Sequence, residues 1–183
     1  MILQRSLSAG AAAIQNLTVG YLWYTFESMD IQRNEFYVTL FSNASKEVCT
    51  DNSLTAFTIH LVQPINLGST SDWEVGLAEV SYKAPNRHIM QGAVVDIVSP
   101  INVLIYCDLI TPQFVGSDNV RLLRTIICST QLGNNLFQNV YNLPVENPLF
   151  KDIRIELRVL DGTHAAFEDS VIPTKVVLHF RRI

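Results

Sequence analysis

The sequence predicts an all-β sandwich, and three observations lead to that prediction. From residue 35 onward, several segments alternate apolar and polar residues with a period of two, which is the pattern of strands with one buried face. Turn-rich segments, at 64–72, 83–91 and 111–119, separate these strands. The helical period is absent over the same region, which argues against helices alternating with strands.

The first part of this region contains three alternating stripes and one shorter candidate strand at 93–98. The apolar members of the stripes are Phe36, Val38 and Leu40; Phe57, Ile59 and Leu61; and Trp73, Val75 and Leu77. After Leu77 the apolar phase slips to Val80 and Tyr82. A slip of one residue predicts a β-bulge near Ala78 or Glu79.

The second part contains four strands of two kinds. Segments 152–159 and 175–182 alternate cleanly, with polar residues on the opposite face. Segments 102–110 and 120–128 are apolar on both faces, which predicts cover on both sides, from the opposing sheet and from a neighbouring subunit or a loop. The residues expected in the core are Phe36, Phe57, Trp73, Ile155, Leu157 and Phe180.

About eight antiparallel strands over roughly 150 residues suit a single jelly-roll sandwich, although other sandwiches fit the same count. We assign residues 34–183 to this domain, because 183 residues fit one core. Residues 1–33 form a nearly uncharged N-terminal arm with an aromatic cluster. That cluster is either a lead-in strand on its own sheet or an arm that binds a neighbour.

The sequence shows no pattern that indicates an enzyme. Its four histidines, His60, His88, His164 and His179, lack the close spacing of metal ligands, and His60 and His179 are expected on solvated strand faces. Nucleophile elbows, phosphate-binding glycine loops and Cys-x-x-Cys pairs do not occur. We therefore expect no catalytic residue, no cofactor and no metal.

Charge, apolar runs and cysteines restrict the partners. The formal net charge is −4 and the 13 Lys and Arg are scattered, which argues against a specific nucleic-acid partner. No stretch reaches the roughly 18 apolar residues that a membrane span requires. Cys49, Cys107 and Cys128 are an odd set, which predicts free thiols in a reducing compartment such as the cytoplasm or nucleus.

Several fragments, in collinear order, resemble one protein family. They are EFYVTLFSNAS at 35–45, SDWEVGLAEVSY at 71–82, NVLIYCDLITPQFVG at 102–116, IRIELRVLDG at 153–162 and VVLHFRR at 176–182. Together with shorter matches at 122–124 and 137–145, they resemble the penton (vertex, minor capsid) proteins of virophages and Polinton/Maverick-type elements. The chain departs from the family at Phe41, where proline is frequent, in its unmatched N-terminal segment, and in lacking room for an inserted outer domain.

This resemblance implies a structural protein with a single jelly roll. It implies a homopentamer at the fivefold vertices of an icosahedral virion, beside a double jelly-roll major capsid protein. Such a protein is assembled inside the host cell, in cytoplasm or nucleus, and then resides in the virion. It supplies no catalytic residues.

From the residues themselves we expect the subunit interface to draw on the arm and on the two-sided apolar segment 102–110. The candidates are Tyr21, Trp23, Tyr24, Phe26, Leu104, Tyr106 and Ile110. Two other functions compete with the capsid role. One is a soluble jelly-roll binding module, lectin-like or cytokine-like, that recognises carbohydrate or a receptor. The other is a cupin-type enzyme, which would need the metal ligands that the sequence lacks.

Overall fold

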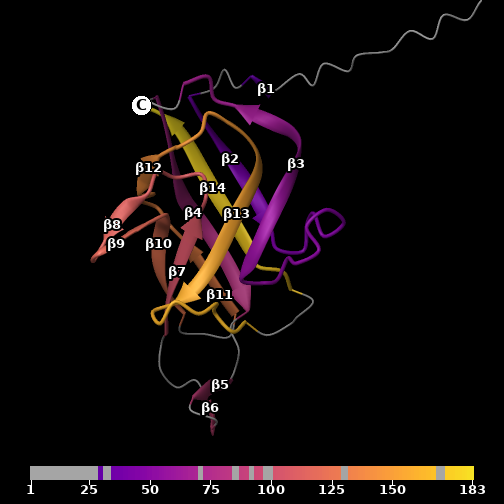
Figure 1. Cartoon of the computed structure of the whole chain (residues 1–183), viewed down its shortest axis with the longest axis vertical. Coiled ribbons are helices and arrows are strands. Elements are labelled where there is room, and N and C mark those ends of the chain that lie inside the picture. Colours follow the sequence, from indigo (N-terminus) through magenta and orange to yellow (C-terminus); the bar gives the residue numbers. More distant parts are fainter. Residues whose placement is uncertain are drawn as a thin grey trace, which may run out of the picture.

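The computed structural model describes residues 29–30, 34–69, 72–83, 87–90, 93–96, 101–128, 132–167 and 172–183, with the backbone alone described at 29–30, 87–90 and 93–96. These residues form an all-β sandwich, with no α-helix among them (Figure 1). Apart from one short parallel pair, every paired strand is antiparallel. The fold class predicted from the alternating pattern is confirmed.

The sandwich has two main sheets. Sheet A has the order β1 (Met29–Asp30), β3 (Ala56–Asn66), β13 (Leu149–Val159), β7 (Ile101–Cys107) and β10 (Leu122–Cys128). Sheet B has the order β11 (Leu132–Leu136), β4 (Trp73–Lys83), β14 (Lys175–Arg182) and β2 (Glu35–Phe41), and β12 (Asn142–Pro144) also pairs with β4. Neighbouring strands therefore come from distant parts of the chain, which crosses repeatedly between the sheets.

Two hairpins lie outside these sheets. They are β5 (Arg87–Met90) with β6 (Ala93–Asp96), and β8 (Gln113–Val115) with β9 (Asp118–Val120). The strand expected at 93–98 is thus present as β6, but it pairs with β5 in a separate hairpin (Figure 1). Its short apolar run gave no indication of which strand would pair with it.

The core lies between the two sheets. Five of the six residues expected there are buried, each at most 2% exposed: Phe57, Trp73, Ile155, Leu157 and Phe180. The sixth, Phe36, is partly buried and packs against the core. Its ring stacks on Phe180 at 4.6 Å between centroids and meets Trp73 edge-on at 5.6 Å.

The bulge predicted in β4 is confirmed. On the paired strand β14, Leu178 lies opposite Leu77 and Val177 lies opposite Glu79, so Ala78 is the extra residue. The extra residue restores the inward direction of Val80 and Tyr82, which are buried like Val75 and Leu77 before it. A second bulge lies in β10, where Leu122 and Arg124 face consecutive positions of β7 and Leu123 is extra.

Part of the segment assigned to the arm belongs to the sandwich. Met29 and Asp30 pair in parallel with Ile65 and Asn66 at the edge of sheet A. The aromatic cluster of the arm, with Tyr21, Trp23, Tyr24 and Phe26, lies outside the described residues.

Candidate subunit interface

The structure separates the three interface candidates taken from segment 102–110. Leu104 and Tyr106 lie on the outer face of β7, where both are half-buried, while Val103 and Ile105 are fully buried in the core. Ile110 is itself fully buried and forms a bridge with Val145. Because the chain turns inward after β7, Ile110 has no surface for a neighbour, and the structure removes it from the predicted interface.

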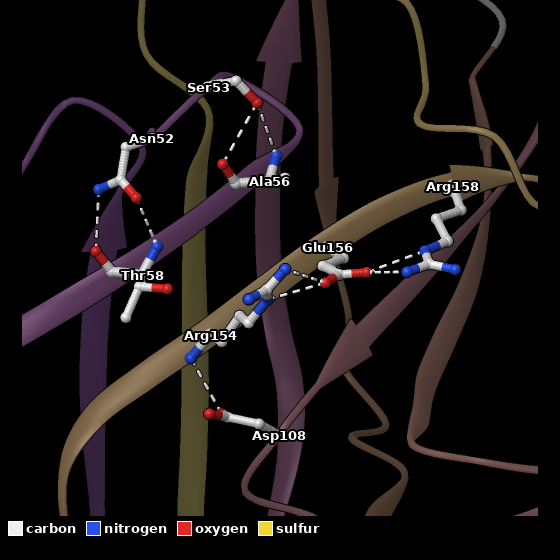
Figure 2. A network of polar contacts seen from close by, with 8 residues as sticks. All are labelled: Asn52, Ser53, Ala56, Thr58, Asp108, Arg154, Glu156 and Arg158. Atoms are coloured by element: carbon white, nitrogen blue, oxygen red, sulfur yellow. Dashed lines mark hydrogen bonds and ion pairs between the residues drawn. The ribbon is translucent and has the colours of Figure 1, made fainter. Parts of the chain in front are cut away.

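The outer face of sheet A is dominated by a polar ladder along β13 (Figure 2). The Glu156 carboxylate accepts hydrogen bonds from Arg154 Nε at 2.8 Å and from Arg158 Nε at 2.8 Å. The Arg158 guanidinium lies 5.5 Å from the centre of the Tyr106 ring. Asp108 Oδ1 accepts a 2.9 Å hydrogen bond from the backbone N–H of Arg154. The ladder therefore holds β13 and β7 in register from outside the core.

The two arginines control the ionisation of Glu156. Burial alone would raise the pKa of this carboxyl, but hydrogen bonds and charges from Arg158 and Arg154 hold its pKa below the ordinary value. A depression of about 280 Å³ lies beside the ladder and is also bordered by Arg121. Arg121 pairs with Glu146 at 2.6 Å. Every arginine that borders this depression contacts a carboxylate, and Arg154 and Arg158 share the one of Glu156.

One flank of the sandwich is formed by the edge strands β10 and β11, with β10 on the left in Figure 1. It exposes large apolar side chains. Ile127 of β10 is 60% exposed and Leu132 of β11 is 62% exposed. We call this surface the β10–β11 flank. The β8–β9 hairpin, with Phe114 at 82% exposure, lies on the same side.

The opposite flank is formed by β2, β3 and the connection 42–55, with β3 and the connection on the right in Figure 1. We call it the β2–β3 flank. Its exposed apolar side chains are Phe41, Val48 and Val62, the last at 90% exposure. Single exposed apolar residues are common, but here they occur on both opposite flanks.

The backbone of β3 on this flank is already hydrogen-bonded. Asn52 acts as a substitute strand neighbour, since its side chain both donates to Thr58 O at 2.9 Å and accepts from Thr58 N at 2.8 Å (Figure 2). Ser45 Oγ accepts from His60 N at 3.0 Å. These contacts block strand addition at this edge, so a partner would meet side chains rather than free backbone.

The cysteines and histidines do not form a reactive centre in the described part of the chain. All three cysteines are unpaired, and burial raises the pKa of Cys107 to about 12 and of Cys128 to about 11. No group of three His, Cys, Asp or Glu side chains among the described residues could hold a metal ion. His60 contacts Asp152 Oδ1 at 2.7 Å.

His179 differs from the expectation of a solvated strand histidine. It lies on the outer face of β14, as predicted, but only 9% of its surface is exposed. Tyr37 stacks on its ring with centroids 4.6 Å apart. An outward position is therefore not solvated when a neighbouring strand carries a large ring.

Two exposed apolar residues of the flanks that were not singled out from the sequence share one signal. Val62 follows Leu61, and Ile127 follows Ile126, so each is the second member of an adjacent apolar pair within a strand. Since neighbouring residues of a strand point to opposite faces, one member of such a pair is left outside the core. That signal identifies an exposed apolar residue, although not its partner.

Among the residues that the structure describes, there is no helix capable of crossing a membrane. Comparisons with known protein families and with curated proteins find no match to this chain.

Proposed function

We propose that this chain is a structural capsid protein, a penton or minor capsid protein that forms homopentamers at the fivefold vertices of an icosahedral virion. The proposal combines the fragment resemblance to virophage and Polinton/Maverick-type penton proteins with two features of the structure. In this role the protein is not an enzyme, and its partners are its own copies and a double jelly-roll major capsid protein.

The strand order supports a single jelly roll. The principal strands, numbered one to eight along the chain, are β2, β3, β4, β7, β10, β11, β13 and β14. In these numbers the order of sheet B is 1-8-3-6 and the order of sheet A is 2-7-4-5. Two interleaved Greek keys produce this arrangement. A single jelly roll also agrees with the fragment resemblance, because the resembling fragments span nearly the whole sandwich.

The observation that carries the proposal is the pair of apolar flanks on opposite edges of the sandwich. In a closed ring, one surface of each subunit contacts a different surface of the next subunit. The β10–β11 flank and the β2–β3 flank are two such surfaces, and both expose apolar side chains. A stable contact typically buries roughly 800 Å² on each partner. Because the centre of such a contact is apolar, the exposed apolar side chains of the two flanks would lie there.

The test is a pair of charge substitutions, one on each flank. Val62→Glu changes the β2–β3 flank and Ile127→Glu changes the β10–β11 flank, and both positions are well exposed in the monomer. Unsubstituted protein should show a species of five 20.6-kDa chains, about 103 kDa, by light scattering of concentrated solutions. Each substitution should shift the protein to monomer, because it places a charge in an apolar contact.

Mixing the two variants makes the test specific to a ring. Each variant retains one intact flank, so the mixture should form heterodimers that cannot close. Leu160→Glu, at an exposed apolar position in the turn after β13, is the matched control and should leave the pentamer intact. A soluble binding module would instead stay monomeric at every concentration. If particles reconstituted with the major capsid protein never carry this chain at fivefold positions, the proposal is wrong.

A further inference from the structure

The two edge strands of sheet B, β2 and β11, carry matching patterns of exposed side chains. On each strand, an apolar, a polar and a second apolar residue follow one another at alternate positions, so they share the outer face of the sheet. The apolar members are between 41% and 71% exposed. The residues are Tyr37, Thr39 and Phe41 on β2, and Leu132, Asn134 and Leu136 on β11.

The backbone of β2 is open on the side away from β14. At the end of this strand pair, Ser42 N–H donates to Thr174 O at 2.9 Å. Because hydrogen-bonded positions alternate along an antiparallel pair, the even-numbered residues of β2 bond to β14. Tyr37 and Thr39 therefore point their N–H and C=O away from β14. Within the described part of the chain, no hydrogen bond reaches these backbone groups.

The backbone of β11 is open in the same way. Phe137 N–H, directly after the strand, donates to Ala78 O of β4 at 2.9 Å. By the same alternation, Asn134 and Leu136 point their N–H and C=O away from β4. These groups also have no hydrogen-bond partner among the residues that the structure describes. Both edges of sheet B can therefore accept a further strand.

These edges lack the usual protection against strand addition. Natural sheets block their edges with charged residues, proline or a covering segment, because free N–H and C=O groups attract other strands. In sheet A, Asn52 and Ser45 cover the edge of β3. β2 contains one charged residue, Glu35, whereas β11 contains none, and neither strand contains proline. An unprotected edge on a native protein indicates that another strand belongs there.

The strand directions allow the two edges to meet. Every strand pair of sheet B is antiparallel, so β2 and β11, at its two edges, run in opposite directions. A second copy that lies edge to edge with the first, with its strands in the same direction, places its β2 antiparallel to β11. The residues with open backbone groups have their side chains on the outer face at both edges. The two sheets can therefore join with their core faces on the same side.

We propose that copies of this chain join by strand pairing, with β11 of one copy bonded to β2 of the next. The register that matches the exposed residues places Leu136 opposite Tyr37, Asn134 opposite Thr39 and Leu132 opposite Phe41. A shift of two residues would place Leu136 opposite Glu35 or Thr39 instead. The matched register covers the exposed apolar side chains of both edges and adds backbone hydrogen bonds.

This pairing rests on the proposed function and specifies its subunit contact. β11 belongs to the β10–β11 flank and β2 to the β2–β3 flank, so the pairing links unlike surfaces of successive copies, as a ring requires. Pairing of β2 with a second β2 would also match apolar with apolar residues. That contact would close after two copies and leave β11 uncovered.

Hydrogen exchange of the full-length chain tests the backbone pairing. Dilute and concentrated samples are compared, and light scattering reports the number of chains in each. The amides of Thr39 and Asn134 should exchange at least about tenfold more slowly in the assembled protein, because they become hydrogen-bonded. The amide of Arg154 is the control, since it already donates to Asp108 on the outer face of sheet A. Its exchange should not depend on concentration.

Charge substitutions test the register. Tyr37→Glu or Leu136→Lys alone should raise the concentration at which half of the chains assemble about tenfold or more, because each places a charge against an apolar side chain. Together in one chain they place opposite charges across the contact and should bring that concentration back to within about threefold of the unsubstituted value. Phe41→Glu with Leu136→Lys is the matched control and should restore nothing. All three side chains are exposed, so the variants should fold, and the melting temperature of dilute protein verifies this.

The outcomes separate this pairing from the capsid proposal. A five-chain species whose Thr39 and Asn134 amides exchange as fast as in dilute protein would overturn the pairing alone. Assembly that is insensitive to Leu136→Lys, as expected of β2–β2 dimers, would also overturn it. Slowed exchange and charge rescue in assemblies that never reach five chains would support the pairing and contradict the fivefold ring. Concentrated protein that stays monomeric would overturn both.

Discussion

At the scale of single residues, Trp73 at the beginning of β4 belongs to an aromatic group in the core. It is 2% exposed, and Phe36 meets it edge-on while stacking on Phe180. Phe180 in turn stacks against Phe150 of the opposite sheet at 5.8 Å. This aromatic group links sheet B to sheet A, so its members contribute more to stability than their number suggests.

Truncating Trp73 to Ala should lower the free energy of unfolding by about 3–5 kcal/mol, because it removes buried area and leaves a cavity. Phe114→Ala, at an 82% exposed position, is the control and should change it by no more than about 0.5 kcal/mol. Urea denaturation measures both. Equal effects of the two substitutions would show that Trp73 is not in the core.

The three thiols should differ sharply in reactivity. At pH 8 a thiol with a pKa of about 11, such as Cys128, is ionised to about one part in a thousand, and Cys107 still less. Cys49 is half-exposed and should be alkylated first. We expect one fast thiol in native protein and three in denaturant, and Cys49→Ser should remove the fast one. Rapid labelling of Cys107 or Cys128 in the native state would contradict this.

At the scale of elements, β4 and β10 show what periodicity can reveal. In β4, polar residues surround the apolar stripe, so the slip from Leu77 to Val80 was visible and predicted the bulge at Ala78. In β10, the adjacent pair Leu122 and Leu123 is flanked by charged residues on both sides, so the register shift interrupted no apolar stripe and left no change of phase to detect. A bulge can be predicted only where the two faces differ in polarity.

A hollow of about 440 Å³ on the outer face of sheet B and the covered edge of β3 could not be predicted from sequence. The hollow depends on Gly76 meeting residues 140–142 across a strand pair, and the edge depends on Asn52 reaching the backbone of Thr58. Both are individual contacts between residues that are not neighbours in the sequence, and no periodic pattern encodes them. The core, by contrast, follows from alternation alone.

The ladder on β13 should make stability depend on pH in a definite direction. Because the pKa of Glu156 is lower in the folded state, its contribution is complete above the ordinary carboxyl pKa and disappears as pH falls through the lower folded value. The difference in melting temperature between unsubstituted protein and Glu156→Gln should therefore be largest near neutral pH and should shrink as the pH falls below the ordinary carboxyl pKa. Glu47→Gln, an exposed glutamate between β2 and β3, should show no such trend. A difference in melting temperature that grows in acid would contradict the lowered pKa of Glu156 in the folded state.

At the scale of the whole molecule, the sandwich presents unlike surfaces in different directions. The two flanks expose apolar side chains, the outer face of sheet A carries paired charges, and the outer face of sheet B carries the hollow. Paired charges need no partner, whereas exposed apolar edges gain from one. This division favours lateral contacts through the flanks, with the hollow left accessible.

The N-terminal arm gives a prediction at this scale. Deleting residues 1–28 keeps Met29 and Asp30, which pair with β3, and should leave the melting temperature of the monomer unchanged. If Tyr21, Trp23, Tyr24 and Phe26 anchor the arm on a neighbour, the deletion should weaken the pentamer or its attachment to the major capsid lattice. Electron microscopy of reconstituted particles measures vertex occupancy. Equal occupancy by both proteins would remove this role from the arm.

The central place of β14 bears on how the protein is synthesised. β14 lies between β2 and β4, which precede it by about a hundred residues or more, so sheet B cannot close until residue 182 has left the ribosome. Until then the apolar faces of β2 and β4 have no strand between them. We therefore expect a product truncated before β14 to expose these apolar faces and to aggregate. Synthesis therefore yields a closed sandwich only when β14 has been made, so the last strand of the chain decides whether the rest is sheltered from solvent.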